Sequence, residues 1–160
     1  MKEKPIFVEK QYLGLNRNWL LTRLVLAIFC FIIYSIEENR DRNADLLLVV
    51  GVSILVISSL LTFIIHYKTS IYDKSLVLDG FWTTSRVKID FGSIKTVEKT
   101  PYSNFLMNNP VYNLHKKGTI RFYTRGKYAI KLTDNDGLIY VIGSQHPDEI
   151  VRLIAERIRL

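Results

Sequence analysis

The stretch LLLVVGVSILVISSLLTFII, residues 46–65, governs how this 160-residue chain is organised. Its twenty residues carry no charge, and its few polar members are serines and one threonine. An α-helix rises about 1.5 Å per residue, so twenty residues span about 30 Å, the thickness of the hydrocarbon core of a bilayer. A buried core helix of a soluble domain is the alternative, but it needs other apolar elements around it. The stretch therefore predicts a membrane-spanning helix.

A second apolar run, WLLTRLVLAIFCFIIYSI, covers residues 19–36. Its one charge, Arg23, lies near the start, where a long side chain can reach the headgroups. A cleaved signal peptide fits poorly, because eighteen residues precede the run and no small-x-small cleavage site follows it before EENRDRNAD. We expect a transmembrane hairpin over residues 19–67, with spans at about 19–36 and 46–66 and a connector at 37–45.

The charges on either side of the two runs predict their orientation. Residues 1–23 contain five basic and two acidic residues, and residues 68–160 contain fifteen basic and nine acidic ones. The connector contains two basic and four acidic residues. Basic flanks stay on the cytoplasmic side of a membrane. The sequence therefore predicts an inner-membrane protein with two spans, a cytoplasmic N-terminal segment (1–18) and a cytoplasmic C-terminal domain (68–160).

In the C-terminal part of the chain, apolar and polar residues alternate with a period of two, which is typical of β-strands. SIYDKSLVLDG (70–80) indicates a strand pair or one bent strand, and SRVKIDFGSIKTVEKT (85–100) and GTIRFYTRG (118–126) alternate apolar and polar residues. KYAIKLTDNDGLIYVIGS (127–144) predicts a hairpin with its turn at Asp136-Gly137. A helix should follow from Pro147, with acidic residues in its first turn and an apolar stripe. The fold class is therefore α+β: antiparallel strands closed by one C-terminal helix.

Three stretches resemble one group of proteins: FVEKQYLGLNRNWLL (7–21), VKIDFGSIKTVE (87–98) and DGLIYVIGSQHPDEIVRLI (136–154). They are similar to small bacterial membrane proteins that carry a two-helix hairpin and a bacterial pleckstrin-homology-like (PH-like) domain. The resemblance implies a PH-like antiparallel β-barrel or sandwich with one C-terminal α-helix. It transfers a fold and a location and no reaction, because no biochemical activity characterises that group.

Basic residues are concentrated in the last third of the chain. Six fall within sixteen positions and are interleaved with two tyrosines: Lys116, Lys117, Arg121, Arg125, Lys127 and Lys131. Near an anionic membrane surface, each Lys or Arg contributes about 1 kcal/mol of attraction. These six are the candidates for binding lipid headgroups. A solvated sheet face is the alternative. Nucleic acid also binds basic, aromatic-bearing sheets, but no nucleic-acid signature is present, so none is expected as a partner.

The segment PYSNFLMNNPVYNLHKKG (101–118) is predicted as the longest loop of the domain. Loops run over protein surfaces, so its large apolar residues either fold back onto the core or offer a patch to a partner. The candidates for binding a partner protein or a second copy of the chain are Phe105, Leu106, Met107 and Tyr112.

No pattern of catalytic or metal-ligating residues emerges. The adjacent Ser144 and His146 precede a helix, where such residues cap the helix far more often than they catalyse. The single cysteine, Cys30, lies in an apolar run. We therefore expect no catalytic residue, metal or cofactor, and a non-enzymatic module that binds membrane lipid or a partner protein. The alternatives are a membrane-bound enzyme with a site in the loop 101–118 and a nucleic-acid-binding domain.

Overall fold

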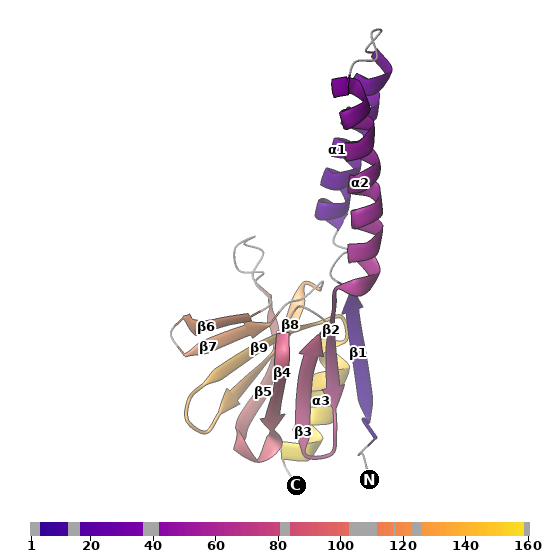
Figure 1. The fold of residues 1–160 in the computed structure, drawn as a ribbon. Coiled ribbons are helices and arrows are strands. Elements are labelled where there is room, and N and C mark those ends of the chain that lie inside the picture. Colours follow the sequence, from indigo (N-terminus) through magenta and orange to yellow (C-terminus); the bar gives the residue numbers. More distant parts are fainter. Residues whose placement is uncertain are drawn as a thin grey trace. The chain divides into compact units, whose positions relative to one another are not determined.

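The computed structural model describes residues 4–12, 17–36, 42–80, 84–102, 112–116, 118–122 and 126–158 (Figure 1). The chain divides into two compact units. One unit contains Met1–Gln11 together with His66–Leu160, and the other contains Tyr12–Ile65. The N-terminal residues therefore belong with the C-terminal domain and not with the helices that follow them in sequence.

The unit of residues 12–65 consists of two helices, α1 (Arg17–Ile36) and α2 (Arg42–Ile64). Both are long and apolar enough to cross a membrane, as the sequence predicts. They pack on each other through small residues: Ala27, Cys30, Ala44 and Gly51 are buried. The expected second span ran to residue 66, but α2 ends at Ile64 and His66 already begins a strand.

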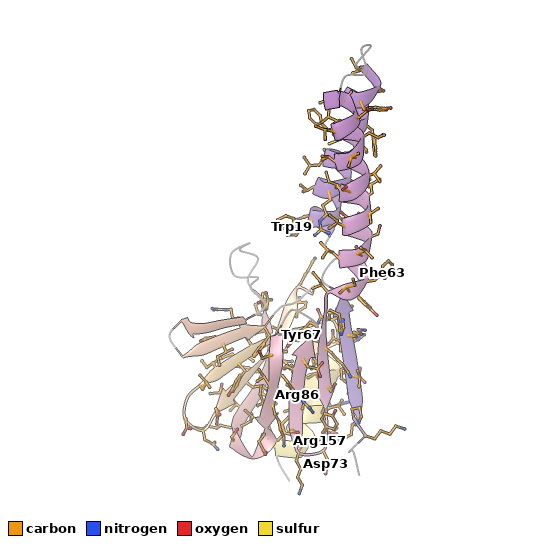
Figure 2. All side chains as sticks on the ribbon, viewed as in Figure 1. Trp19, Phe63, Tyr67, Asp73, Arg86 and Arg157 are labelled. Atoms are coloured by element: carbon orange, nitrogen blue, oxygen red, sulfur yellow. The ribbon has the colours of Figure 1, made fainter. Side chains whose placement is uncertain are left out.

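Large apolar side chains project from both helices, as Figure 2 shows for Trp19 and Phe63. Only 11% of the most apolar stretch of each helix is buried within the structure. The core helix of a soluble protein is mostly covered by its own chain, and these two helices are not. Exposed apolar area on this scale needs an apolar solvent or a partner.

Two sheets make up the other unit. The first has the strand order β1-β2-β3-β4. Its strands are β1 (Phe7–Tyr12), β2 (His66–Ile71), β3 (Ser75–Gly80) and β4 (Thr84–Asp90). The second has the order β5-β8-β9-β7-β6. Its strands are β5 (Ile94–Pro101), β6 (Tyr112–Lys116), β7 (Thr119–Phe122), β8 (Tyr128–Asp134) and β9 (Ile139–Ser144).

The α+β class is confirmed, and three details of the expectation are corrected. The sheets do not close into a barrel among the described residues, and β7 pairs with β9 in parallel, whereas the expected barrel or sandwich was antiparallel throughout. The segment 112–116, predicted as loop, forms β6 and pairs with β7. A short edge strand with a register shift between Asn113 and Lys116 leaves little alternation to detect in sequence.

The C-terminal hairpin and helix form as predicted. Gly137 has a φ of 81° in the turn between β8 and β9, a conformation that a side chain would strain. Helix α3 (Pro147–Ile158) starts at Pro147 and buries Ile150 and Ile154 completely. It packs against β5, β8 and the short 3₁₀ turn η2 (Phe91–Ser93).

Apolar residues from both sheets form the core. In the first sheet Ile71 pairs with Leu76, and Leu76 with Ile89, so all three side chains lie on one face, and all are buried. In the second sheet Ile130 and Ile142 pair and are fully buried. Burying one such side chain stabilises the fold by about 1.5–3 kcal/mol. The domain is therefore held by ordinary apolar packing.

Strand β1 was not anticipated from the sequence. It lies beside β2, and the backbone N–H of Ile6 donates to the carbonyl of Ile71 at 2.8 Å. Its residues alternate, with Val8 and Lys10 exposed and Glu9 and Gln11 buried. The chain thus leaves this sheet at β1, forms both long helices, and returns to the neighbouring strand β2.

Candidate functional site

A groove of about 420 Å³ lies on the second sheet. Strands β5, β7, β8 and β9 and the residue after β5 contribute its lining: Thr100, Pro101, Tyr102, Thr119, Arg121, Lys131, Ile139 and Val141. The lining combines two cations, three hydroxyl-bearing side chains and an aliphatic floor. Such a mixture suits a ligand that has an anionic group and an apolar part.

Strand register explains why the two cations share this groove. Lys131 is opposite Val141, and Val141 is opposite Arg121, so the three side chains point to the same face. Neighbouring strands lie about 4.8 Å apart, which places the backbones of Lys131 and Arg121 about 10 Å apart with Val141 between them. Both side chains are long enough to reach one group held above Val141.

The two cations differ in their surroundings. The Lys131 Nζ donates to the Oε1 of Glu98 at 2.6 Å, an ion pair with the residue opposite it on β5. The guanidinium of half-buried Arg121 has no hydrogen bond or ion pair with the described residues. Within the described part of the chain, Arg121 therefore keeps its donors for a ligand, whereas Lys131 is already partly neutralised.

The structure brings together two of the six predicted headgroup residues, Arg121 and Lys131. Lys127 is exposed and precedes β8, and Lys116 ends β6 opposite Thr119. Lys117 and Arg125 lie outside the described residues. The basic character of all six residues was visible in the sequence, but only the strand order shows which of the six share a groove.

The predicted partner-binding residues fall mainly outside the described part of the chain. Phe105, Leu106 and Met107 are not among the described residues. Tyr112 begins β6, opposite Phe122 of β7. The hypothesis of an apolar docking loop stays a prediction.

A second polar site lies inside the domain, where Glu9 of β1 meets the end of β9. Glu9 is 6% exposed, and its carboxylate accepts three hydrogen bonds. The donors are the Ser144 hydroxyl at 2.6 Å, the Gln145 backbone N–H at 2.7 Å and the Gln11 amide at 3.0 Å. Burying an acid is unfavourable unless donors surround it, and these three donors, close to the N-terminus of α3, offset that unfavourable term.

This network connects the two ends of the chain. The Gln11 amide also donates to the carbonyl of Gly143 at 3.0 Å, so both inward residues of β1 bind β9 or the residue after it. The network was missed in sequence because FVEKQY has polar residues on both alternating faces. Nothing in that pattern distinguishes a buried glutamate from a solvated one.

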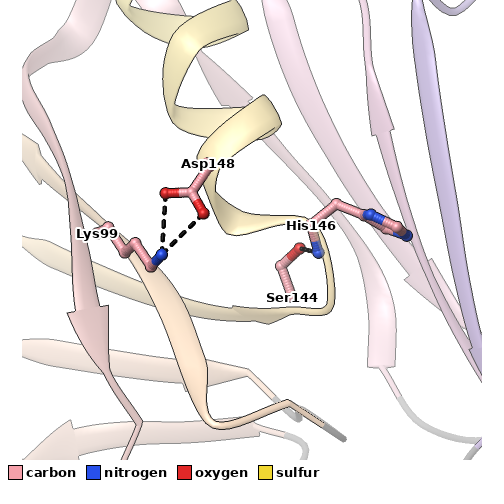
Figure 3. A network of polar contacts seen from close by, with 4 residues as sticks. All are labelled: Lys99, Ser144, His146 and Asp148. Carbon is pink, nitrogen blue, oxygen red and sulfur yellow. Dashed lines mark hydrogen bonds and ion pairs between the residues drawn. The ribbon is translucent and has the colours of Figure 1, made fainter.

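The Ser144–His146 pair forms a local turn between β9 and α3. The backbone N–H of His146 donates to the Ser144 hydroxyl at 2.9 Å, while the imidazole points away from Ser144 (Figure 3). That ring instead meets Phe7 edge-on, with ring centroids 6.4 Å apart. Ser144 and His146 are therefore not arranged as a nucleophile and its base. The same figure shows Lys99 donating to both carboxylate oxygens of Asp148, at 2.8 and 2.9 Å.

Two hydroxyls in the core, on Tyr67 and Thr69 of β2, lack a hydrogen-bond partner within the described structure. Burial raises the pKa of the Tyr67 phenol well above its ordinary value of 10.0, and the nearby charge of Glu9 acts in the same direction. The adjacent Thr69 hydroxyl acts on the pKa in the opposite direction, but more weakly than burial. Tyr67 is thus a neutral phenol in the core.

Among the described residues, no group of three His, Cys, Asp or Glu side chains is placed to hold a metal ion. Comparison with known proteins gives no assignment. No protein-family model matches the chain, and no curated protein matches it significantly. The groove and the buried network are therefore interpreted from their own chemistry.

Proposed function

We propose that this chain is a membrane-anchored, non-enzymatic binding module, with α1 and α2 spanning the inner membrane and the sheets on the cytoplasmic side. One observation supports a hairpin that enters and leaves on the same side: β1 and β2, which flank the helices, are neighbours in one sheet. Strands cannot pair across a bilayer. The basic excess of both flanking regions favours the cytoplasm.

We further propose that the sheet unit is a PH-like domain. Two sheets and a single C-terminal helix that packs on β5 and β8 support this assignment. The parallel β7–β9 pair is a departure from an all-antiparallel arrangement. The proposal rests on architecture, together with the sequence resemblance at residues 136–154.

The groove on the second sheet is proposed to bind an anionic headgroup. The observation that carries this function is the convergence of Arg121 and Lys131 on the two sides of Val141. Binding of a headgroup needs charge complementarity and an apolar wall, and the groove contains both. It needs no reacting group. A second copy or a partner protein is the alternative occupant of the module.

The test is a double substitution, Arg121→Ser with Lys131→Ser, in the full chain. The full chain is required because a shortened chain beginning at residue 68 would lack β1 and Glu9. The protein in a neutral detergent is titrated with anionic or zwitterionic lipid, and bound lipid is measured by native mass spectrometry. Two lost contacts of about 1 kcal/mol each predict roughly 30-fold weaker binding of anionic lipid.

The matched control is Arg86→Ser with Lys88→Ser, which removes the same two charges from exposed positions on β4 (Figure 2 labels Arg86). This control variant should retain most of the wild-type affinity for anionic lipid. In a separate titration, binding of anionic lipid to the wild type should weaken as the salt concentration rises. Equal affinity for zwitterionic lipid, or an equal loss in both double variants, would contradict a specific role for the groove.

A further inference from the structure

We propose that Glu98 makes the groove selective for a phosphate monoester over a phosphate diester. The inference rests on the proposed function, since it concerns the same groove. It follows from the order of side chains along one row of the sheet: Glu98, Lys131, Val141 and Arg121 occupy successive strands β5, β8, β9 and β7.

Lys131 stands between two competing partners in this row. On one side, one strand away, is the Glu98 carboxylate at 2.6 Å. On the other side is the space above Val141, toward Arg121. The side chains of Lys131 and Glu98 are 34% and 54% exposed, so the ion pair is solvated and exchangeable. A ligand therefore competes with Glu98 for the Lys131 ammonium, and a more strongly charged ligand draws it further toward the groove.

The charge of the ligand and the number of its terminal oxygens decide which ligands can draw Lys131 away from Glu98. A guanidinium binds two oxygens of a phosphate as a fork. A phosphate diester has two terminal oxygens, both of which the fork contacts, and its single negative charge is shared with Arg121, which leaves little to attract Lys131 away from Glu98. A monoester has a third terminal oxygen and a second charge, with which it can draw Lys131 away from Glu98. The groove therefore binds a diester mainly through Arg121 and a monoester through both cations.

The rest of the lining fits the ester part of such a ligand. Ile139 and Val141 form an aliphatic floor, and the hydroxyls of Thr100 and Thr119 lie within the same lining. The monoester can come from a membrane lipid, such as phosphatidic acid, or from a soluble phosphate ester. Both sources present the same dianionic group.

The experiment uses Glu98→Gln, which removes the competing charge and keeps the shape of the side chain. Glu156→Gln, at an exposed position of α3, is the control with the same change in net charge. The full chain in neutral detergent is titrated with phosphatidic acid (monoester), phosphatidylglycerol (diester) and glycerol 1-phosphate (soluble monoester). A pH of about 8 keeps the monoester predominantly dianionic.

Wild type should bind phosphatidic acid more tightly than phosphatidylglycerol. Glu98→Gln should raise the affinity for phosphatidylglycerol about two- to fivefold, the range that exposed ion pairs give. The preference for phosphatidic acid over phosphatidylglycerol should therefore become smaller. Glu156→Gln should change neither affinity. Competition between glycerol 1-phosphate and phosphatidic acid supports a soluble ester as ligand, and absence of competition supports a lipid.

Failure of this inference is distinguishable from failure of the proposed function. If wild type binds both anionic lipids equally, or if Glu98→Gln behaves like Glu156→Gln, the role of Glu98 is wrong although the groove still binds anions. If wild type binds neither anionic lipid better than a zwitterionic lipid, and does not bind glycerol 1-phosphate, the proposed function itself fails.

Discussion

Glu9 shows how much one residue can contribute to joining distant parts of a chain. Its carboxylate lies in the interior and receives hydrogen bonds from Gln11, Ser144 and Gln145. Ser144, the last residue of β9, in turn accepts a hydrogen bond from the His146 N–H in the turn before α3. A single side chain before the first long helix thus binds the end of β9 and the turn that leads into the last helix.

We predict that Glu9→Ala destabilises the domain more than Glu9→Gln. Alanine leaves several buried donors without an acceptor, a loss of about 2–4 kcal/mol in the free energy of unfolding. Glutamine keeps one acceptor oxygen for Gln145 and Gln11, and its NH₂ can donate to the Ser144 hydroxyl, so about 1 kcal/mol should be lost.

The measurement is thermal unfolding of the full chain in detergent, followed by circular dichroism. Val8→Ala is the control, because Val8 is a neighbour on β1 whose side chain is exposed. Equal stability of Glu9→Ala and wild type would show that the network does not stabilise the fold.

Between elements, the contact of α1 with α2 depends on small residues. A Cβ added at Gly51 would lie 3.0 Å from Phe31 Cε1 and 3.3 Å from Cys30 Cβ, so this glycine lets the helices approach closely. In lipid, close packing of small residues replaces the hydrophobic effect as the source of helix association. The long apolar runs are obvious in sequence, but which residues face each other is not.

The geometry predicts that Gly51→Cys forms a disulfide with the native Cys30. Bridged cysteines have Cβ atoms about 3.5–4.5 Å apart, close to the 3.3 Å found here, and a small movement of Phe31 would make room. The chain, with a protease site inserted between the helices, is oxidised and cleaved, and non-reducing electrophoresis shows whether the fragments stay joined.

Two controls accompany this crosslink. Val52→Cys, at an exposed position next along α2, should not crosslink, and Cys30→Ser should abolish crosslinking of Gly51→Cys. Efficient crosslinking of Val52→Cys instead would mean that α2 presents a different face to α1.

For the whole molecule, the important feature is that the sheet unit is discontinuous in sequence. Met1–Gln11 and His66–Leu160 form one unit, and the two apolar helices are inserted between its first two strands. Both ends of the inserted segment must therefore return to the same sheet. This connectivity supports an even number of membrane crossings independently of the charge distribution.

We predict that a green fluorescent protein fused after Leu160 fluoresces, and that alkaline phosphatase fused there is inactive, because both termini are expected in the cytoplasm. Alkaline phosphatase inserted in the connector 37–45 should be active, since the connector is expected outside. Active phosphatase after Leu160 together with an inactive connector fusion would reverse the proposed orientation.

Local patterns in the sequence were enough to predict the long apolar helices, the hairpin at Asp136-Gly137 and the helix that starts at Pro147. Each of these features is encoded by residues that are adjacent in the sequence. The signals are an uncharged run of membrane length, a glycine that tolerates positive φ, and a helix start with proline and acidic residues. The folded chain was needed to show that β1 joins the sheet, that β7 pairs with β9 in parallel, and that Arg121, Lys131 and Glu98 share one row. Strand pairing depends on hydrogen bonds between residues far apart in the chain, and local alternation of polar and apolar residues carries no information about which strands will meet.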